Sequence, residues 1–230
     1  MKKIGLIGGM SWESTELYYR KINCEIKNLL GGHHSAVIAL ESVDFQVIKD
    51  MQDKGDWQGA AEILSLCAKR LERSGADFIL ICTNTMHKVA PAIASAVSIP
   101  LIHLADATAE KIKTSGYRNV GFLGTKFSME DSFYTGHLKD KHQLDILVPN
   151  ERDREIVHDV IYNELCLGKV SEQSRLEFLR IIQSLYDAGA ECIIEGCTEI
   201  VLLVNQSHTN IPLFDTTTIH AQKAALLAIQ

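Results

Sequence analysis

"KIGLIGGMSWESTELYY" (residues 3–19) and "NVGFLGTKFSMEDSFYT" (residues 119–135) are the two stretches that decide the fold. Each begins with a short apolar run that a glycine interrupts, and each continues with helical periodicity. That pattern is typical of a strand, a tight turn and a helix. The second stretch repeats the first, so we expect a chain built from two related halves.

Two further blocks of sequence repeat in the same order. "RSGADFILICTNT" (73–85) matches "DAGAECIIEGCTE" (187–199), and "SIPLIHLADATAEK" (98–111) matches "NIPLFDTTTIHAQK" (210–223). Shared α/β composition could imitate one such block by chance, but hardly three blocks at matched separations. The repeat therefore predicts two similar lobes within one chain.

Short apolar runs alternate with helical patterns in the first half. Strands are expected at 2–9, 35–43, 77–84 and 99–105, and helices at 12–30, 56–76 and 91–98. This alternation favours a parallel sheet with helices on both faces. We predict an α/β fold with two pseudosymmetric Rossmann-like domains, residues 1–102 plus 209–230 and residues 103–208. Ligand sites form where the carboxyl ends of parallel strands meet, so the active site is expected in the cleft between the domains.

The bulk composition excludes several classes of protein. A formal net charge of −6 and an isoelectric point of about 5.8 argue against nucleic acid or an anionic membrane surface as the main partner. No apolar stretch approaches the length that spans a bilayer, and the N-terminal apolar run is too short for a signal peptide. We therefore expect a cytoplasmic protein that binds neither nucleic acid nor membrane.

The six cysteines show no metal-binding pattern. None forms a CxxC pair or stands at zinc-finger spacing from histidines, so no structural metal site is expected. Reduced and mostly buried thiols are the usual state in a cytosolic chain of this size. "GLIGGM" also lacks the G-x-G-x-x-G spacing of a dinucleotide site. Only Cys82 and Cys197 are candidates for a catalytic role, because each comes at the end of an apolar run.

Two turns with polar residues occupy equivalent places in the repeat, each directly after a strand and before a helix. The equivalent pairs are Thr83 and Cys197, Asn84 and Thr198, and Thr85 and Glu199. Backbone N–H groups at such turns favour anions, especially carboxylates. Two opposed acid/base groups suit racemisation, in which one group removes an α-proton and the other supplies a proton from the opposite face. Helix capping explains either turn alone, but explains the matched pair less well.

Several motifs together resemble one enzyme family. "GLIGGMSWEST", "CTNTMHK", "LGT", "GCTE" and "PLFDTTTIHA" look like the aspartate/glutamate racemase family, a cofactor-independent branch of the Asp/Glu/hydantoin racemase superfamily. The resemblance runs essentially from end to end. It implies a two-domain α/β isomerase with its active site between the domains, no PLP or metal, and usually a homodimer. It also implies a two-base mechanism with one catalytic cysteine from each half.

The sequence departs from the family pattern in the first half. The family has Cys-Asn-Thr where this chain has Thr83, Asn84 and Thr85, and Cys82 stands one residue early. Adjacent side chains of an extended strand end point to opposite faces, so Cys82 should face away from the site unless the strand carries a bulge. A threonine hydroxyl is rarely deprotonated at neutral pH. Thr83 should therefore be a poor base that can still donate or relay a proton.

The resemblance assigns the base to the second half. In the family, the second-half cysteine faces the α-proton of the L-enantiomer. Carried onto Cys197, this implies action on L-aspartate or L-glutamate, with Thr83 returning the proton and Glu199 orienting or activating the thiol. Backbone N–H groups and hydroxyls at both turns would stabilise the dianion. Both substrates use the same kinds of donor, so the sequence leaves the choice between them open.

Other polar residues near the turns are candidates for supporting roles. Those expected to contact substrate are Met10, Ser11, Gln52, Asn84, Thr85, Thr125, Lys169 and Thr198, and those expected to support the site are Glu199, His87 and Asp44. Gln52 and Lys169 are favoured for carboxylate contacts, and His87 would orient Thr83 or carry charge. Capping, packing or simple solvent exposure are the alternative interpretations for these residues.

Two other functions stay open at this point. A one-cysteine decarboxylase of the same superfamily would use the retained thiol to protonate an enediolate. A non-catalytic amino-acid-binding protein with a decayed racemase site would keep the fold without the reaction, and Thr83 is the feature that supports it. The polar residues of the two turns favour the racemase.

Overall fold

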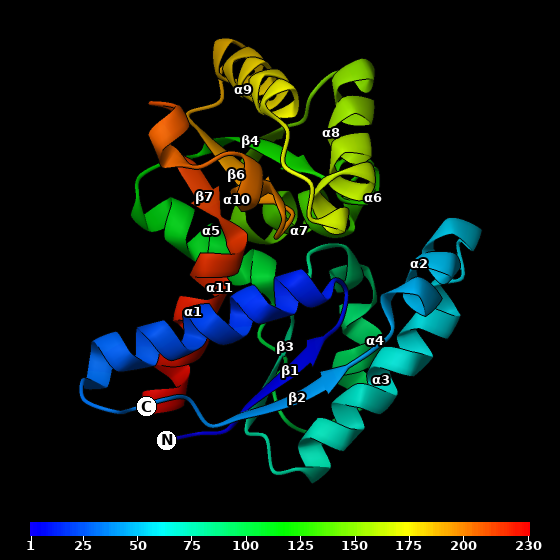
Figure 1. Cartoon of the computed structure of the whole chain (residues 1–230), viewed down its shortest axis with the longest axis vertical. Coiled ribbons are helices and arrows are strands. Elements are labelled where there is room, and N and C mark those ends of the chain that lie inside the picture. The colour runs from blue at the N-terminus through cyan, green and yellow to red at the C-terminus, as the bar shows by residue number, and fades with distance from the viewer. The chain divides into compact units, whose positions relative to one another are not determined.

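The computed structural model describes residues 1–230, which divide into two compact units (Figure 1). Unit 1 comprises Met1–Leu104 and His220–Gln230, and unit 2 comprises Ala105–Ile219. The second lobe expected from the sequence ended at residue 208. Unit 2 instead continues to Ile219 because the strand β7 (Leu213–Asp215) pairs with β6 of that unit. No helix of the structure has both the length and the apolar character to cross a membrane.

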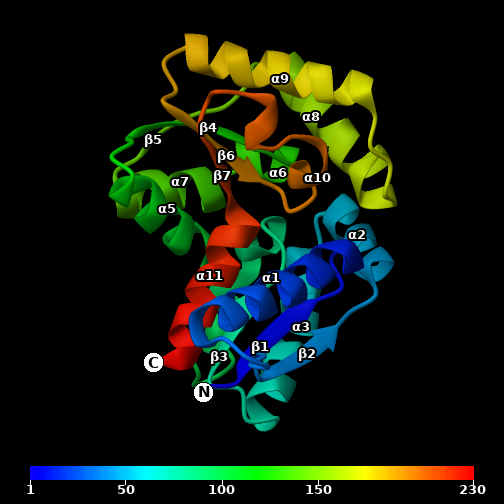
Figure 2. The same ribbon diagram turned by 60° about the vertical axis from the view of Figure 1, so that its left-hand side comes forward.

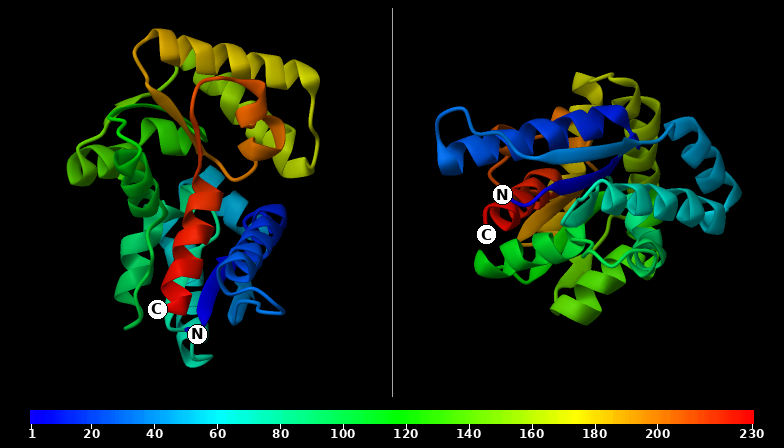
Figure 3. Two further views of the ribbon diagram at one scale, coloured as in Figure 1. Left: turned by 90° about the vertical axis from the view of Figure 1, so that its left-hand side faces the viewer. Right: turned by 90° about the horizontal axis from the view of Figure 1, so that it is seen from below.

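Unit 1 is built on a three-stranded parallel sheet with strand order β2-β1-β3. Its main elements are β1 (Ile4–Gly8), α1 (Trp12–Leu30), β2 (Ile38–Ser42), α2 (Phe45–Lys54), α3 (Trp57–Arg73) and β3 (Phe78–Ile81). Because crossovers between parallel strands are right-handed, this order places α1 and α3 on opposite faces of the sheet. Figure 3 shows the two helices in these positions.

The remaining elements of unit 1 follow β3 and close the chain. A 3-10 helix, η1 (Thr85–Val89), leads into α4 (Ala90–Ser95). The strand expected at 99–105 is reduced to a single bridge between Leu101 and Ile79, because α5 already begins at Leu104. The C-terminal helix α11 (Thr216–Ile229) lies beside α1 from His220 onward (Figure 2).

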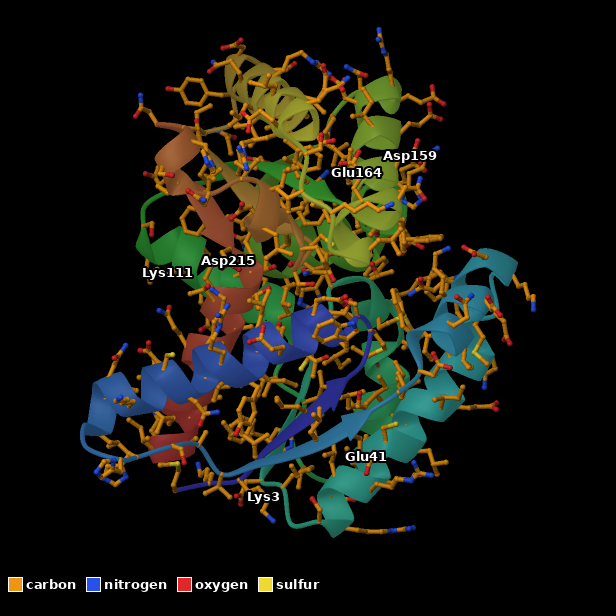
Figure 4. The ribbon with its side chains drawn as sticks, viewed as in Figure 1. Lys3, Glu41, Lys111, Asp159, Glu164 and Asp215 are labelled. Carbon is orange, nitrogen blue, oxygen red and sulfur yellow. The ribbon has the colours of Figure 1, made fainter.

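Unit 2 has a four-stranded parallel sheet with strand order β5-β4-β6-β7. Its elements are α5 (Leu104–Thr114), β4 (Asn119–Gly124), α6 (Lys126–Glu130), α7 (Ser132–His142), β5 (Asp145–Leu147), α8 (Glu151–Asn163), η2 (Leu165–Leu167), α9 (Glu172–Asp187), β6 (Cys192–Gly196), α10 (Ile200–Leu203), η3 (Gln206–His208) and β7. Figure 4 labels Asp215 where β7 passes into α11. The fold class predicted from the sequence is confirmed in both units.

The sequence repeat is visible in the hydrogen bonds of the two sheets. Ile79 donates its N–H to Pro100 O at 2.9 Å, and the equivalent Ile193 donates to Pro212 O at 2.8 Å. The order β2-β1-β3 in unit 1 corresponds to β5-β4-β6 in unit 2. Strands β1, β3 and β6 are buried along their whole length, which explains their continuous apolar sequences. In each unit the residues that follow parallel strands share one sheet edge, and both polar turns lie at such edges.

Candidate active site

The turn of unit 1 begins with a buried thiol. Cys82 continues β3 by donating its N–H to Ile7 O at 2.9 Å, and its own carbonyl accepts a hydrogen bond from Ser14 Oγ at 2.6 Å. The side chain has no exposed surface, and burial raises the pKa of the Cys82 thiol. A fully buried thiol with a raised pKa is not a reactive group. Cys82 is therefore the buried thiol that the strand periodicity predicted.

Thr83 is the partly exposed residue of this turn, whereas Asn84 and Thr85 are buried. The backbone turns sharply here, and Asn84 O accepts a hydrogen bond from the N–H of His87 at 3.0 Å. The helix expected after β3 starts as the 3-10 helix η1. The three residues thus present hydroxyl and amide groups at the carboxyl end of β3, with no carboxylate or thiol among them.

His87 holds the backbone of this turn in place. Its Nδ1 lies 2.8 Å from Thr83 O, which can only accept, so Nδ1 carries the proton. Its Nε2 accepts the N–H of Leu104 at 3.2 Å. Both ring nitrogens are engaged and the side chain is buried, so the geometry favours orientation of Thr83 over proton transfer.

Gln52 comes from α2 and lies against η1. Its side chain is 4% exposed, and Nε2 donates to Met86 Sδ at 3.1 Å. Gln52 is thus a buried side-chain amide at the edge of the turn, and the carboxylate contact predicted for it stays a prediction. Asp44 is exposed and caps α2, since its carboxylate accepts the N–H of Gln46 at 3.0 Å. That local bond explains why the sequence has an acid at position 44.

Met10 and Ser11 follow β1 through a glycine that cannot be replaced. Gly9 has φ +90°, and a Cβ there would lie 2.2 Å from Val43 O. The Met10 side chain packs into the core of unit 1, so its backbone is the part available to a ligand. Ser11 is the N-cap of α1, as predicted, and accepts the N–H of Ser14 at 3.3 Å.

Thr125 occupies the equivalent position after β4 in unit 2. It caps α6, with Oγ1 accepting the N–H of Ser128 at 3.3 Å and lying 3.1 Å from Ser128 Oγ. The side chain is 3% exposed. Capping therefore accounts for Thr125 within unit 2, and its hydroxyl stays at the carboxyl edge of the sheet.

The turn after β6 has quite different chemistry. Cys197 Sγ donates to Glu199 Oε2 at 3.0 Å, and Thr198 Oγ1 donates to the same oxygen at 2.6 Å. All three side chains are buried. Burial, the Glu199 carboxylate and the nearby Cys166 raise the pKa of the Cys197 thiol well above its usual range. At rest Cys197 is thus a thiol whose proton points at a carboxylate.

Close packing of glycine and phenylalanine fixes the start of this turn. A Cβ on Gly196 would lie 2.3 Å from the Phe122 ring, and one on Gly124 would lie 3.0 Å from Gly196 O. The Phe122 ring stacks in turn on Tyr134 at 4.9 Å between centroids. The residue before Cys197 therefore has no room for a side chain, and the thiol is set by a rigid backbone.

Lys169 lies outside this packed region. It is exposed in the loop after η2, and its N–H donates to the carbonyl of Glu164, labelled in Figure 4 at the end of α8. Within unit 2, no hydrogen bond or ion pair described here brings its ammonium group to the Cys197 turn.

Two residues that hold these turns were missed by the sequence analysis. Ser14 donates to Cys82 O, and Thr216 Oγ1 donates to Glu195 O at 2.8 Å in β6, the strand that ends directly before Cys197. The Ser14 contact joins residues 68 positions apart, so no local pattern could indicate it. Both hydroxyls satisfy carbonyls at the ends of strands that lead into the candidate site.

Comparisons with known proteins identify the family and the fold of the chain. The family model described as Asp/Glu/hydantoin racemase matches residues 7–224. The crystal structure of a candidate Asp/Glu racemase from Yersinia pestis is 54% identical, with a TM-score of 0.94 and complete coverage of both chains. That of an aspartate racemase homologue from Pyrococcus horikoshii OT3 is 35% identical, with a TM-score of 0.86 and the same coverage.

A relative from Bacillus subtilis is similar over nearly the whole chain as well. The broad-specificity amino-acid racemase RacX of Bacillus subtilis (strain 168) is 23% identical over 226 residues, which cover 93% of this chain and 92% of RacX. The family match includes both polar turns and the strands that carry them. The chain belongs to the Asp/Glu/hydantoin racemase family.

Proposed function

We propose that the protein is a cofactor-independent amino-acid racemase that acts on L-aspartate, L-glutamate or both. Cys197 removes the α-proton, and Thr83 supplies a proton from the opposite face. The observation that carries the proposal is the Cys197–Glu199 pair at the end of β6, matched by the hydroxyl of Thr83 at the repeated position after β3. The family and its relatives support an amino-acid substrate.

Cys197 has to lose its own proton before it can act as a base. Glu199 Oε2 lies 3.0 Å from Sγ and accepts that proton as substrate binds. The thiolate then takes the α-proton, so the Cα–H bond breaks and an S–H bond forms. The electron pair left on Cα delocalises into the substrate carboxylate, which the N–H groups and hydroxyls of the turns stabilise.

Thr83 completes the inversion as an acid. Its Oγ1–H donates a proton to the opposite face of Cα, and the resulting alkoxide regains a proton from solvent. Glu199 releases the proton that it took from the thiol to solvent, which restores the resting site. A hydroxyl donates readily to a carbanion but removes an α-proton poorly. Because the equilibrium constant of racemisation is 1, kcat/KM is the same for the two enantiomers. The unequal groups therefore show in kcat and KM taken separately, with a lower kcat from the D-enantiomer and an unchanged final ratio at equilibrium.

The substrate-binding residues extend this proposal. Gln52, Asn84 and Thr85 offer amide and hydroxyl groups beside the first turn, and Thr125 and Thr198 offer hydroxyls at the equivalent edge of unit 2. We assign these groups to the substrate carboxylates, with the backbone of Met10 and Ser11. Lys169 would reach a side-chain carboxylate from its exposed loop. One relative is named a broad-specificity amino-acid racemase and another an aspartate racemase homologue, so a substrate panel is the appropriate assay.

Deuterium exchange tests the proton-transfer roles separately. Wild-type protein in D₂O should exchange the α-proton of L-aspartate or L-glutamate and form the D-enantiomer, and Cys197→Ser should abolish both signals. The isosteric Thr83→Val variant should still exchange the α-proton of the L-enantiomer, because Cys197 can return a deuteron to the same face. Its racemisation should fall much further than its exchange.

The same assay distinguishes the alternatives. Binding of L-aspartate or L-glutamate without any exchange would replace the proposal with a non-catalytic binding protein. Release of CO₂ from an arylmalonate, with no exchange on amino acids, would indicate the decarboxylase. Equal loss of exchange and racemisation in Thr83→Val would contradict the separate roles of the two groups.

Cofactor independence, assembly and location complete the proposal. Exchange should survive both a chelator and borohydride, since neither a metal nor a Schiff base takes part in it. All six cysteines are free, which fits the reducing cytoplasm that we propose. We also propose a homodimer, and light scattering of the purified protein would return twice the chain mass of 25.6 kDa.

A further inference from the structure

One carboxylate in unit 2 gathers an unusual set of donors. Asp106, in the first turn of α5, accepts His137 Nε2 at 2.6 Å and His142 Nε2 at 2.7 Å, both at Oδ1. Lys141 Nζ lies 2.7 Å from the other oxygen, Oδ2. The two imidazoles and the lysine all come from the last turns of α7. Two ring nitrogens therefore converge on a single carboxylate oxygen.

The fold itself does not require this cluster. The repeat aligns Tyr134 with Tyr18, so His137 corresponds to Lys21 and His142 to Ile26 in the first half. Two imidazoles directed at one carboxylate are thus a feature of the second half alone. The aligned helix of the first half keeps its fold without them. The cluster is also outside the racemase chemistry, which concerns the turns after β3 and β6.

The donor set matches the preferences of a transition-metal ion. Two imidazole nitrogens and one carboxylate oxygen form a three-ligand site for Zn²⁺ or Co²⁺, with the remaining position open to water. We propose that Asp106, His137 and His142 form a binding site for a divalent transition-metal ion of this class. The cysteine spacing that argued against a zinc finger has no bearing here, because the cluster contains no cysteine.

The burial of the cluster suits a site that an ion can enter. The side chains of His137, His142 and Asp106 are 24%, 12% and 27% exposed. They are half-buried, so their rotamers are restricted while solvent still reaches them. Zinc lies about 2.0–2.2 Å from nitrogen and oxygen ligands. Rotation of the two rings toward each other would exchange the two hydrogen bonds for two metal bonds and admit the ion.

Metal binding changes which ring nitrogen of each histidine carries the proton. Each ring now presents Nε2–H to the carboxylate, and metal binding requires the other tautomer, with the proton on Nδ1 and the Nε2 lone pair on the metal. Asp106 would bind through Oδ1 and keep Lys141 on Oδ2. Because α5 carries the carboxylate and α7 carries both imidazoles, the ion would cross-link these two helices.

Lys141 supplies a sharp internal test. Its ammonium group is the positive charge nearest to the proposed ion, so it weakens binding by electrostatic repulsion. Lys141→Gln should tighten the dissociation constant for Co²⁺ or Zn²⁺ by about fivefold at low ionic strength. A cluster that serves only as an ionic link between helices would show no gain in metal affinity when this lysine is removed.

The experiment is a titration of the whole purified protein with Co²⁺, followed by its visible absorption, and with Zn²⁺, followed by calorimetry. We expect one saturable site whose spectrum shows nitrogen and oxygen ligands and no sulfur-to-cobalt charge transfer. Asp106→Asn, His137→Ala and His142→Ala should each weaken the dissociation constant by about tenfold or more. Zinc should raise the melting temperature of the wild type and have less effect on these variants.

Matched controls separate this site from casual binding. His33 and His34 are exposed neighbours in a loop, so the double variant His33→Ala/His34→Ala removes two imidazoles and should leave binding unchanged. Cys24→Ser removes the exposed thiol and should also leave it unchanged. Equal loss in the His33/His34 control would indicate adventitious binding only and overturn the proposal. No saturable binding to the wild type would overturn it without any variant.

Discussion

The two halves of this chain share a scaffold but differ in the chemistry at the ends of their equivalent strands. After β3, a threonine hydroxyl is followed by an amide, and His87 holds the backbone through Thr83 O. After β6, a thiol and a hydroxyl both donate to Glu199. The first turn has donors without a base, whereas the second has a thiol with a proton acceptor. A duplicated fold can therefore keep one reaction geometry while it assigns unequal roles to its two sites.

Removal of the thiol is the strongest way to break this comparison. Cys197→Ala should lower kcat/KM for the L-substrate by about 10³-fold to 10⁴-fold, because no other group in the turn can take the α-proton after activation. Initial rates by chiral chromatography would measure the loss. Cys82→Ala is the matched control, since its thiol precedes the equivalent position in unit 1 and is fully buried. If the Cys82 variant lost activity and the Cys197 variant kept it, the alignment of the two turns would be wrong.

Removal of the proton acceptor should be nearly as damaging. Glu199→Gln keeps the size of the side chain but cannot accept the thiol proton, so kcat should fall about 10²-fold. The part of the pH–rate profile that reports deprotonation of the Cys197 thiol should also change in Glu199→Gln. Thr198→Val, which deletes the other hydrogen bond to Glu199, is the comparison. A kcat unchanged in Glu199→Gln would show that Cys197 loses its proton by another route.

The two halves also differ in the helix that follows each repeated Ile-Pro segment. In unit 1, Tyr18 Oη donates to His220 Nδ1 at 2.9 Å, and His220 Nε2 donates to Ile102 O at 2.9 Å. The aligned pair in unit 2 is Tyr134 and Thr108. Burial raises the pKa of the Tyr134 hydroxyl, and Thr108 beside it partly offsets this effect. A titratable side chain therefore occupies this position in unit 1 alone.

This difference predicts a pH dependence of folding. Burial lowers the pKa of His220 to about 3, a hydrogen bond to Ile102 opposes this, and the charge of His103 adds to it. The unfolded state then binds a proton near pH 6.5 while the folded state does not, so stability falls as pH drops from about 6.5 towards 3. The contribution from this one group should reach about 2 kcal/mol at pH 5.

Urea unfolding between pH 7 and pH 5 would measure this effect. His220→Gln should flatten the pH dependence of the free energy of unfolding, whatever it does to the stability at pH 7. Thr108→Val alters the aligned position of unit 2 and should leave the slope as in the wild type. An equal slope in wild type and His220→Gln would mean that the histidine does not titrate between the two states in this range.

The smallest expected change makes the two turns more alike. Thr83→Cys places a thiol at the position aligned with Cys197, so the variant gains a base for the D-enantiomer. We expect kcat for D-aspartate or D-glutamate to rise about tenfold, while kcat/KM changes by the same factor for both enantiomers because the equilibrium constant of racemisation is 1. Chiral chromatography from each pure enantiomer gives both values. A variant with no gain on the D-enantiomer would contradict the assignment of the first-half acid to position 83.

The repeat allowed most of the fold to be predicted from sequence. The repeat located the strands, the Ser11 cap and the two equivalent turns in the sequence. This was possible because glycines that interrupt apolar runs and apolar periodicity are local signals. The strand expected at 99–105 was wrong beyond Leu101, because α5 begins at Leu104. A short apolar run is equally compatible with a single strand bridge and with the start of a helix, so the sequence did not distinguish the two. The boundary at 209 differed because strand pairing between β6 and β7 is a non-local property.

The candidate site was predictable only in part. Alignment of the repeat identified Thr83 and Cys197, but no spacing rule shows that Glu199 accepts hydrogen bonds from both neighbours. The tautomer of His87 depends on Thr83 O and on the N–H of Leu104, which the fold brings to its ring. The three donors to Asp106 lie more than thirty residues away in the chain, and their convergence requires the packing of α5 on α7.

The make-up of unit 1 has a consequence for the order of events during synthesis. Its last segment, His220–Gln230, is synthesised after the whole of unit 2, and the Tyr18–His220 hydrogen bond joins positions 202 residues apart. Unit 2 is one continuous segment and has all its residues earlier. Domains usually complete in N- to C-terminal order during synthesis. In this chain the unit that emerges first has to wait for a segment that is made after the second unit.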